Sequence, residues 1–551
     1  MAVATGWRDR IVPTIQDRPR LKKPPLIYWL QAPVAALLGT HEDHDAELPT
    51  GRIWAYRLPS VLGALAAVLV TWRLGCDMFA PPVGWLAGLL LGASAVVLFD
   101  VRQARADQVL LAFTALAYLL LWKIWRARDR RTRAPAGWVV ALWLAVGLGA
   151  MTKGPITPAL VALSALALSL LTRQWRWLAH LRPVPGGLVL VGLVAPWLVA
   201  VGLCVGWRPL GLAVLDEVLL RSITPKEGHW GPPGTYLVLL PVLFWPGSLA
   251  LVPGLRRAFH RSLRPAPYAG PRDRQPAEPS SAPDPARQRC LGSLRRRWQT
   301  RAAGRAAELF CLAWLVPGWV VFELLVTKLP HYTLPLYPAL ALLCARGLFD
   351  IRAAWLPFLH TRLGRTALWG WVALSELIAV GLPLAVAWLG RLDAGAAVLT
   401  AFGVSVAASQ ALLIALAVRL RETRIAQSQC LALVASAFVS LALFQLSLPH
   451  LRALWLSSRL VACVRAIDPP ARRPLAAVGY HEDSLVFLTR GRIWKLQAAQ
   501  LAEWLDAHPD GLVAITTTSR CDLVLRRVAA VEGFNYSTGR WQTIELLERP
   551  P

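Results

Sequence analysis

The chain has 551 residues, 56% of them apolar, and it carries a formal net charge of +27. Its mean hydropathy of +0.46 excludes an ordinary soluble enzyme of this length and predicts an all-α polytopic membrane protein. A strongly basic balance is also typical of nucleic-acid-binding proteins. Here the cations lie mostly in short loops between apolar runs, a pattern that sets membrane topology, so no nucleic-acid partner is expected.

The first informative stretch is Arg18 to Trp29, in which four cations precede a double proline and an apolar run with Tyr28. Pro24 and Pro25 fix φ and prevent a helix from continuing on their N-terminal side, so the cations stand on a stiff, extended entry. Tyr and Trp favour the membrane–water boundary. The pattern predicts a basic loop at headgroup depth that binds a phosphate or, in the plainer interpretation, anionic lipid.

The run from Leu26 to Leu38 is too short to span a bilayer and is predicted to form a re-entrant or interfacial helix. About twelve later runs approach the ~20 residues that a bilayer needs, which predicts about twelve transmembrane helices. These runs are 58–75, 79–99, 107–124, 137–151, 156–173, 186–206, 235–253, 307–327, 330–349, 367–390, 394–418 and 428–448.

The loops between these runs fall into two sets that do not mix. One set is strongly basic, which predicts a cytoplasmic location, and it comprises Arg126–Arg133, Arg173–Arg182, 255–306, Arg346–Arg365 and Arg419–Arg424. Within it, 255–306 contains a stretch rich in Pro, Ala and Ser and is predicted to be a basic, partly disordered loop. The other set holds the polar motifs described below and is therefore expected to face the periplasm.

Beyond Leu448 the composition changes, and residues 449–551 are predicted to form a small α/β domain in the periplasm. Strands are expected at Leu475–Val478, Ser484–Leu488 and Leu512–Thr517, and a helix at Ala498–Ala507. A disulfide between Cys463 and Cys521 stays open for a domain in an oxidising compartment. The eight cysteines show no spacing typical of a zinc site.

Ionisable residues gather at the span ends that are expected to face the periplasm. The segment Val101–Asp107 contains Arg102 and Arg105 beside a carboxylate. A charge at that depth costs free energy, so it indicates a function or a close partner. The plainer interpretation is an ion pair between Asp107 and an arginine that caps the next helix.

Two further loops carry candidate ligands. Residues 152–155 read Thr-Lys-Gly-Pro, and Lys153 can meet a phosphate or simply reach the membrane surface. The next loop runs from Asp216 through Arg221 to His229 and Tyr236. His229 is a candidate ligand or acid–base group, although a single loop histidine often has neither role.

The segment Lys328–Pro338 reads Lys-Leu-Pro-His-Tyr, followed by Leu-Pro and Tyr-Pro. It predicts a kinked helix start that places Lys328, His331 and Tyr332 at the water boundary. An aromatic belt around proline kinks is the plainer interpretation of the same residues.

Together and in this order, these motifs resemble the periplasmic loops of the aminoarabinose transferase and protein O-mannosyltransferase superfamily. Its members are integral membrane glycosyltransferases of the GT-C type. The resemblance implies the GT-C fold and an enzyme that transfers a sugar, usually with inversion, from a polyprenyl (undecaprenyl) phosphate carrier. The implied acceptor is lipid A-like, a glycan or a protein, and neither the sugar nor the acceptor follows from the sequence.

The resemblance also implies roles for single residues. Asp107 matches the second acidic position of the family and is the expected catalytic residue. Lys23 matches the lysine before Pro-Pro and is expected to bind the carrier phosphate, with Arg20 and Arg105 in support. In such a transfer a carboxylate accepts a proton and cations stabilise the departing phosphate. The other expected substrate-binding residues are Arg102, Lys153, Arg221, His229, Tyr236, Lys328, His331 and Tyr332.

The N-terminal loop departs from the family pattern in two ways. The resembled enzymes carry a first span and an Asp-Glu…Arg-Tyr motif ahead of the loop, and the Asp of that motif is the expected base. The printed chain starts inside the loop at Met1, so either the start was assigned too far downstream or this is a truncated copy whose activity is in doubt. Lys22 also stands where the family has Glu, which removes a candidate metal ligand. No cofactor is expected, and His41–Asp45 is the alternative place for a divalent metal.

Two other functions stay open, a catalytically degenerate paralogue or assembly subunit on the same fold, and a transporter. Transporters tend to have internal repeats and ionisable groups in mid-span, whereas the polar motifs here lie at span ends. The expected organisation is a periplasmic loop with an interfacial helix (1–57), a transmembrane domain (58–448) and the C-terminal domain (449–551). The expected location is a bacterial inner membrane, with the active face on the periplasmic side.

Overall fold

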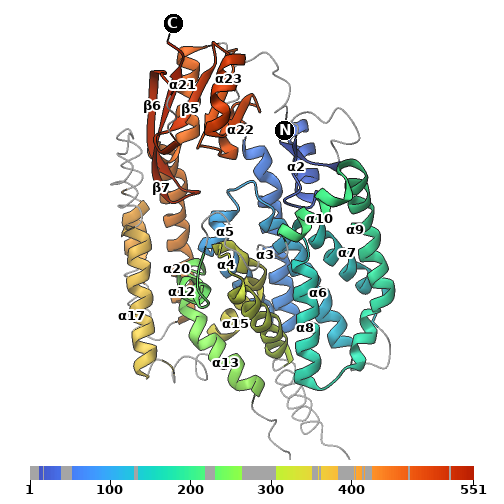
Figure 1. Cartoon of the computed structure of the whole chain (residues 1–551). Coiled ribbons are helices and arrows are strands. Elements are labelled where there is room, and N and C mark those ends of the chain that lie inside the picture. The colour runs from blue at the N-terminus through green and yellow to red at the C-terminus, as the bar shows by residue number, and fades with distance from the viewer. Residues whose placement is uncertain are drawn as a thin grey trace, which may run out of the picture.

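The computed structural model describes residues 11–15, 18–38, 53–128, 134–217, 230–263, 306–349, 358, 361–381, 403, 405–412, 415, 425–469, 472–519 and 523–550. These residues form a helical bundle and a smaller domain with a β-sheet, which lies at one end of the bundle (Figure 1). The N-terminal segment lies at the same end as the sheet domain, at the top of the view.

The N-terminal segment starts with a short hairpin of β1 (Thr14–Ile15) and β2 (Arg18–Pro19) and continues into α2 (Leu26–Leu37). α2 begins directly after Pro25, as the proline geometry predicts, and it is the short apolar helix expected there. Gln31 on its buried face donates hydrogen bonds to the carbonyl oxygens of Tyr56 (3.0 Å) and Ala104 (3.4 Å). These two hydrogen bonds fix α2 to α3 (Ile53–Met78) and to the loop that leads into α6 (Asp107–Ala127).

The bundle consists mainly of apolar helices that follow the predicted runs. Six of the described helices are long and apolar enough to cross a membrane, and shorter apolar helices lie between them. The count of about twelve spans stays a prediction. The six are α3 (Ile53–Met78), α6 (Asp107–Ala127), α7 (Ala136–Lys153), α9 (Pro183–Val205), Ala306–Leu324 and Gln427–His450, the last of which includes α20 (Ile425–Leu441) in part.

The remaining helices of the bundle are shorter. They are α4 (Pro81–Gly92), α5 (Ala95–Asp100), α8 (Ile156–Thr172), α10 (Trp207–Leu215), α12 (Thr235–Leu243), α13 (Leu251–Leu263), α15 (Tyr337–Leu348) and α17 (Arg362–Glu376).

Several predicted boundaries are wrong in detail. α3 begins at Ile53 and not at residue 58, and the run 235–253 is divided between α12 and the start of α13. The run 79–99 is not one helix, because Ser94 bonds back to Leu91 and the amide of Ala95 donates to the carbonyl of Trp245 at 3.0 Å, so α4 and α5 are separate. The loop expected at 255–306 starts as helix, since α13 continues to Leu263. Residues 264–305 and most of the run 394–418 lie outside the described residues.

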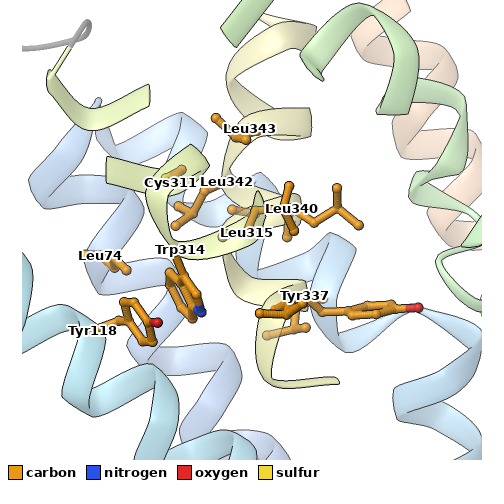
Figure 2. Packing of buried hydrophobic residues seen from close by; sticks show 14 of the residues in the cluster. Leu74, Tyr118, Cys311, Trp314, Leu315, Tyr337, Leu340, Leu342 and Leu343 are labelled. Atoms are coloured by element: carbon orange, nitrogen blue, oxygen red, sulfur yellow. The ribbon is translucent and has the colours of Figure 1, made fainter. Parts of the chain in front are cut away.

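Buried aromatic side chains join the helices of the bundle (Figure 2). Tyr118 of α6 stacks on Trp314 with ring centres 3.7 Å apart, and its hydroxyl bonds to Ser164 of α8 at 2.6 Å. Trp314 Nε1 in turn donates to the carbonyl of Pro335 at 3.2 Å. These contacts hold α6, α8 and the segment around Pro335 in fixed relation, which positions the loops at their ends.

Close backbone packing of α3 and α4 gives a stability prediction. A Cβ at Gly84 would lie 2.4 Å from the carbonyl oxygen of Trp72 and 2.8 Å from the amide of Cys76, so Gly84→Ala must force the helices apart. We expect a loss of about 1–3 kcal/mol in the free energy of unfolding, read as a lower midpoint of thermal unfolding in detergent. At Gly137 of α7 a Cβ meets nothing within 4 Å, so Gly137→Ala should leave the midpoint unchanged or raise it.

The C-terminal domain contains a five-stranded sheet in the order β4-β3-β5-β7-β6. β3 (Leu475–Val478) pairs in parallel with β4 (Ile493–Leu496) and β5 (Leu512–Thr516), while β7 (Arg540–Glu548) pairs antiparallel with β5 and with β6 (Arg526–Asn535). Helices α21 (Leu456–Ile467), α22 (Asp483–Leu488) and α23 (Leu501–Ala507) complete it.

Most of the elements predicted for this domain are confirmed, but the strand expected at Ser484–Leu488 is wrong. These residues form α22, which buries Leu485 and Val486. The run is apolar without a clear period, and in such a short run hydrophobicity does not separate a strand from a buried helix. Cys463 forms no disulfide among the described residues, and Cys521 lies outside them.

Candidate functional site

Three of the polar loops meet at one end of the bundle. α6 begins at Asp107, α7 ends at Lys153, and the 3-10 helix η5 (Pro330–Leu336) carries His331. α6 and α7 pack against each other with the first residue of one beside the last residue of the other. Gly154 ends α7 with a φ of +70°, a conformation that residues with a Cβ rarely adopt, and so allows the chain to turn at this point.

The centre of the cluster is a buried ion pair between Asp107 and Lys153. Lys153 Nζ donates to Asp107 Oδ1, and the two side chains are 17% and 4% exposed, respectively. The partner of Asp107 is thus a lysine from another helix and not an arginine of its own loop. The second carboxylate oxygen, Oδ2, is buried and has no hydrogen-bond partner among the described residues, so it can accept a hydrogen from a bound molecule.

His331 lies between Asp107 and Arg105. Arg105 Nη1 is 3.3 Å from His331 Nδ1, and His331 Nε2 is 3.9 Å from Asp107 Oδ1. Because a guanidinium group can only donate, Nδ1 is the acceptor, and a neutral ring then carries its hydrogen on Nε2, the nitrogen that faces the carboxylate. Ser60 of α3 donates to the carbonyl of Arg105 at 2.9 Å and holds this loop in place.

Tyr332 completes this group from η5. Its ring centre lies 5.0 Å from Lys153 Nζ, and its ring meets that of His331 edge-on with centres 5.2 Å apart. An aromatic face near an ammonium group favours the charged form of that group. Among the residues proposed from the sequence, Arg105, Asp107, Lys153, His331 and Tyr332 are therefore brought together.

Lys23 approaches the same cluster from the N-terminal loop. Its side chain is half-buried and forms no ion pair or hydrogen bond with the described residues. Burial lowers the pKa of Lys23 to about 8, and the positive charge of Lys153 is the next largest cause. Arg105 and Arg20 act in the same direction, and only Asp107 opposes them. Lys23 thus stands among more cations than carboxylates, and such a position favours an anionic ligand.

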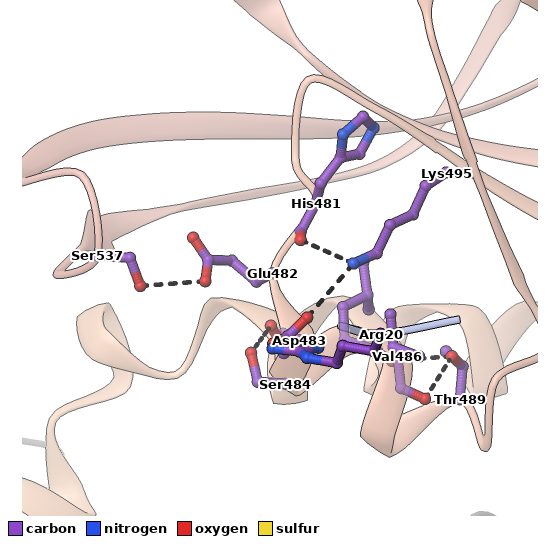
Figure 3. Close-up of polar contacts among 11 residues, drawn as sticks. Arg20, His481, Glu482, Asp483, Ser484, Val486, Thr489, Lys495 and Ser537 are labelled. Atoms are coloured by element: carbon purple, nitrogen blue, oxygen red, sulfur yellow. Dashed lines mark hydrogen bonds and ion pairs between the residues drawn. The ribbon is translucent and has the colours of Figure 1, made fainter. Parts of the chain in front are cut away.

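Arg20 anchors the N-terminal loop to the C-terminal domain (Figure 3). Its Nη2 donates to Asp483 Oδ2 at 2.8 Å, and Lys495 Nζ lies 3.5 Å from the other oxygen of the same carboxylate. Lys495 also donates to the carbonyl of His481 at 3.0 Å, and Glu482 accepts hydrogen bonds of 3.0 Å from side chains of the β6–β7 hairpin. The segment that presents the carboxylate is therefore fixed on both sides.

The ion pair between Arg20 and Asp483 lowers the pKa of the carboxyl group but contributes little to stability, because both side chains are partly exposed. Burial raises the pKa of Asp483, but Arg20 and Lys495 together outweigh it through hydrogen bonds and charge, and they hold the pKa below its usual value. The side chains of Arg20 and Asp483 are 29% and 57% exposed, and exposed ion pairs contribute only about 0–1 kcal/mol. The contact therefore orients the loop more than it stabilises the fold.

Lys328 and Tyr236 belong to a second group. Lys328 is buried and donates to the carbonyl oxygens of Phe322 (2.9 Å) and Glu323 (2.7 Å), so its expected place at the water boundary is wrong. The end of the preceding helix offers unpaired carbonyl oxygens, and these together with the nearby carboxylate satisfy the ammonium group. Tyr236 accepts a hydrogen bond from the amide of Leu329 at 3.2 Å.

The other proposed residues lie elsewhere. The guanidinium carbon of Arg102 sits 4.0 Å from the ring centre of Phe444 and its Nη1 donates to the carbonyl of Leu98. Arg221 and His229 lie outside the described residues.

Sequence reasoning missed two buried polar residues next to the cluster. Gln108 Nε2 donates to Asp100 Oδ2 at 3.0 Å, and both residues are almost fully buried. Asp100 lies in the last turn of an apolar run, and an ionisable residue at such a position is a signal that could have identified it. The two residues support the start of α6 and thereby the position of Asp107.

Metal binding finds no support in the described part of the chain, where no group of three or more His, Cys, Asp or Glu side chains could hold an ion. The His41–Asp45 cluster lies outside the described residues. The expected absence of a cofactor stays a prediction.

Most residues of this cluster lie in a part of the chain that is similar to a known protein family. Residues 22–199 match the family described as dolichyl-phosphate-mannose-protein mannosyltransferase. The undecaprenyl phosphate-alpha-4-amino-4-deoxy-L-arabinose arabinosyl transferase of Pseudomonas aeruginosa (strain LESB58) is 28% identical over 332 residues, or 59% of this chain and 50% of the relative. The protein of the same name from Pseudomonas paraeruginosa is 30% identical over 249 residues, or 44% of this chain and 42% of the relative. The chain spans about half the length of the curated relatives it matches.

Solved structures match over a longer range. ArnT from Cupriavidus metallidurans bound to undecaprenyl phosphate matches with a TM-score of 0.67 at 18% identity, over 98% of this chain and 90% of that chain. The apo form of the same protein matches with a TM-score of 0.65 at 16% identity. These matches confirm the predicted architecture, a mostly helical membrane fold with a small C-terminal sheet domain, and they confirm the resemblance indicated by the loop motifs.

Proposed function

We propose that this chain, an ArnT-like membrane protein of the GT-C type, is a glycosyltransferase that takes its sugar from a polyprenyl phosphate carrier. Undecaprenyl phosphate is the carrier that we infer, because it occurs in the names of the sequence relatives and in the solved complex with the same fold. We further infer a lipid, glycan or protein acceptor and a reaction on the periplasmic face of a bacterial inner membrane.

The observation that carries this proposal is the position of Lys23. A half-buried cation without a carboxylate of its own lies beside the buried Asp107–Lys153 pair, in a loop that matches the family model. A lysine with no role usually keeps its ammonium group in water, and a buried lysine with a structural role usually pairs with a counter-ion. Lys23 does neither among the described residues. A carrier phosphate at this point would supply the missing negative charge.

The neighbouring residues fit a division of roles around that phosphate. Lys23, with Arg105, binds the carrier phosphate and stabilises the charge that develops as the glycosidic bond to it breaks. Asp107 offers its unpaired oxygen to a hydroxyl hydrogen of a bound substrate, and Lys153 holds the other oxygen of the carboxylate through a hydrogen bond. Arg20 orients the loop through Asp483, which gives the C-terminal domain a part in the site.

The proposed function also requires that the segments which form the site lie on one side of the membrane. We infer that the loop 1–57, the motifs at the upper ends of α6 and α7, and the C-terminal domain 449–551 share the periplasmic side. We further infer that the transmembrane domain 58–448 crosses the bilayer and that the predicted basic loop, which follows α13, lies on the cytoplasmic side.

Transfer by the purified full chain tests the proposal. The protein in lipid nanodiscs is incubated with undecaprenyl phosphate that carries 4-amino-4-deoxy-L-arabinose or a neutral hexose, together with lipid A, a glycan or a periplasmic protein extract. Mass spectrometry should show loss of the donor and a mass gain on one acceptor class. Carrier binding without any transfer would favour the catalytically degenerate alternative, and absence of carrier binding would reject the proposal.

The pKa of Lys23 gives a pH dependence for carrier binding. In the free protein Lys23 is half-protonated near pH 8, and an anionic ligand favours the protonated form. Affinity for undecaprenyl phosphate should therefore fall by up to ~10-fold per pH unit above about pH 8, where the carrier phosphate has already lost its second proton. Isothermal titration between pH 6.5 and 9.5 measures this, and Lys23→Arg, which stays charged, should remove the decline. A decline that persists in this variant would assign it to another group.

A further inference from the structure

A cavity lies at the ends of α3, α6 and α7 that are far from Asp107 and Lys153. It is an open pocket of about 240 Å³, lined by the last turns of α6 together with one residue each from α3 and α7. The lining residues are Asp77, Trp122, Lys123, Arg126, Ala127 and Trp138.

The three helices place this cavity at the opposite membrane boundary from the polar cluster. α6 has 21 residues from Asp107 to Ala127, and at ~1.5 Å per residue it extends over roughly 30 Å, the thickness of a bilayer core. α7 ends at Lys153 in the polar cluster and begins near Trp138, and α3 ends just after Asp77. The cavity therefore opens at headgroup depth, on the side where the chain carries its strongly basic loops.

The charges on the lining are unbalanced. Lys123 and Arg126 form no ion pair or hydrogen bond with the described residues, and both lie over indole rings instead. Lys123 Nζ is 5.7 Å from the ring centre of Trp138, and Arg126 Cζ is 5.4 Å from that of Trp122. Asp77 does not neutralise them, because its Oδ1 lies 3.0 Å from Arg73 Nη2.

The aromatic walls are firmly held. Trp122 is 3% exposed and packs edge-on against Phe310 with ring centres 5.3 Å apart. The indole positions are therefore set by the bundle, and the two cations are held over fixed surfaces. A cavity with aromatic walls and two cations can bind a phosphate group by charge, and its walls can contact the carbon atoms that the ligand carries next to the phosphate.

We propose that this cavity is a binding site for the phosphate headgroup of an anionic phospholipid of the cytoplasmic leaflet. The shared chemistry of the ligand is a phosphate group, and the site favours a lipid over free phosphate because the cavity lies where acyl chains meet headgroups and its walls are tryptophan and alanine. A zwitterionic headgroup carries its own cation and gains less from Lys123 and Arg126. The site is independent of the proposed transferase activity.

Thermal unfolding of the full chain with added lipid tests the site. Phosphatidylglycerol and phosphatidylcholine with the same acyl chains, and inorganic phosphate alone, are titrated into the detergent-solubilised protein. Phosphatidylglycerol should raise the unfolding midpoint above the value reached with phosphatidylcholine, and Lys123→Gln/Arg126→Gln should weaken its apparent affinity at least tenfold. Lys123→Arg/Arg126→Lys keeps both charges and should retain most of the shift.

A matched control separates a site from a diffuse basic surface. Arg362→Gln/Arg365→Gln removes two exposed cations, also three residues apart, from the first turn of α17 in another basic loop region. This pair should keep the shift caused by phosphatidylglycerol. An equal loss in both double variants would overturn the proposal, and so would a full shift with inorganic phosphate alone. Because Lys123 and Arg126 form no ion pair or hydrogen bond with the described residues, the midpoint in phosphatidylcholine should stay near the wild-type value and verify the fold.

Discussion

Replacement of Lys23 by methionine is expected to weaken binding of undecaprenyl phosphate about 10- to 100-fold, because a charge-assisted hydrogen bond contributes about 1.5–3 kcal/mol. Transfer should fall at least as much, since the role proposed for this cation is to stabilise the departing phosphate. The fold should not suffer, because Lys23 has no ion pair among the described residues and its removal leaves no carboxylate unpaired. Methionine also keeps most of the buried stem of the side chain.

Lys22 provides the matched control for this variant. It is the preceding residue, carries the same charge and is exposed, whereas Lys23 is half-buried. Lys22→Met should leave carrier affinity within a few-fold of wild type, as measured by titration in nanodiscs. Equal losses in the two variants would mean that the loop acts through its general charge. Near wild-type affinity in Lys23→Met would remove Lys23 from the site.

Asp107→Asn is expected to lower transfer about 10²- to 10⁴-fold, the usual contribution of a positioned acid–base group. It should also destabilise the protein by about 3–5 kcal/mol, because it leaves Lys153 buried without its counter-ion. Loss of activity alone therefore does not separate a direct role in the reaction from a structural one.

The double variant Asp107→Asn/Lys153→Met separates the two roles. It removes both buried charges, so the midpoint of thermal unfolding should return towards wild type while transfer stays low. Recovery of transfer together with stability would mean that Asp107 serves only as a partner of Lys153. Asp100→Asn is the control with a similar buried carboxylate, and since Gln108 can still donate to the new amide oxygen, activity should change little.

The sequence was sufficient to predict which loops come together, but not which charges pair. Alternating spans return the chain to the same membrane face, so motifs at residues 101–107, 152–155 and 328–332 could be expected to converge. The partner of each charge depends on how helices rotate and pack. Lys328 and Lys153 both lie in such motifs, yet Lys328 is bound by Glu323 and by helix-end carbonyl oxygens, whereas Lys153 pairs with Asp107. Asp100 and Gln108 belong to no loop motif and were missed.

The C-terminal domain shows a different limit. Leu475–Val478 was found because a short apolar run bounded by turn residues, here Pro474 and Gly479, is typical of a buried strand. The similar run at Ser484–Leu488 is helical. Glu482 directly precedes α22 and Asp483 is its first residue, and acidic residues at this position favour the start of a helix. This signal outweighs the strand preference of the apolar residues that follow. β6 and β7 are the longest strands in the sheet, but they carry many polar side chains, so hydrophobicity did not predict them.

The contact between Arg20 and Asp483 has a consequence for biosynthesis. The two residues are 463 positions apart. At translation rates of about 5–20 residues per second, the ribosome needs roughly 20–90 s to reach Asp483 after it has made Arg20. During that interval the loop with Lys23 lacks its contact with the C-terminal domain, although Gln31 can already bind the carbonyl oxygens of Tyr56 and Ala104. The nascent chain can therefore form its Asp107–Lys153 pair early, whereas the contact between Arg20 and Asp483 forms only after the last domain has emerged and folded.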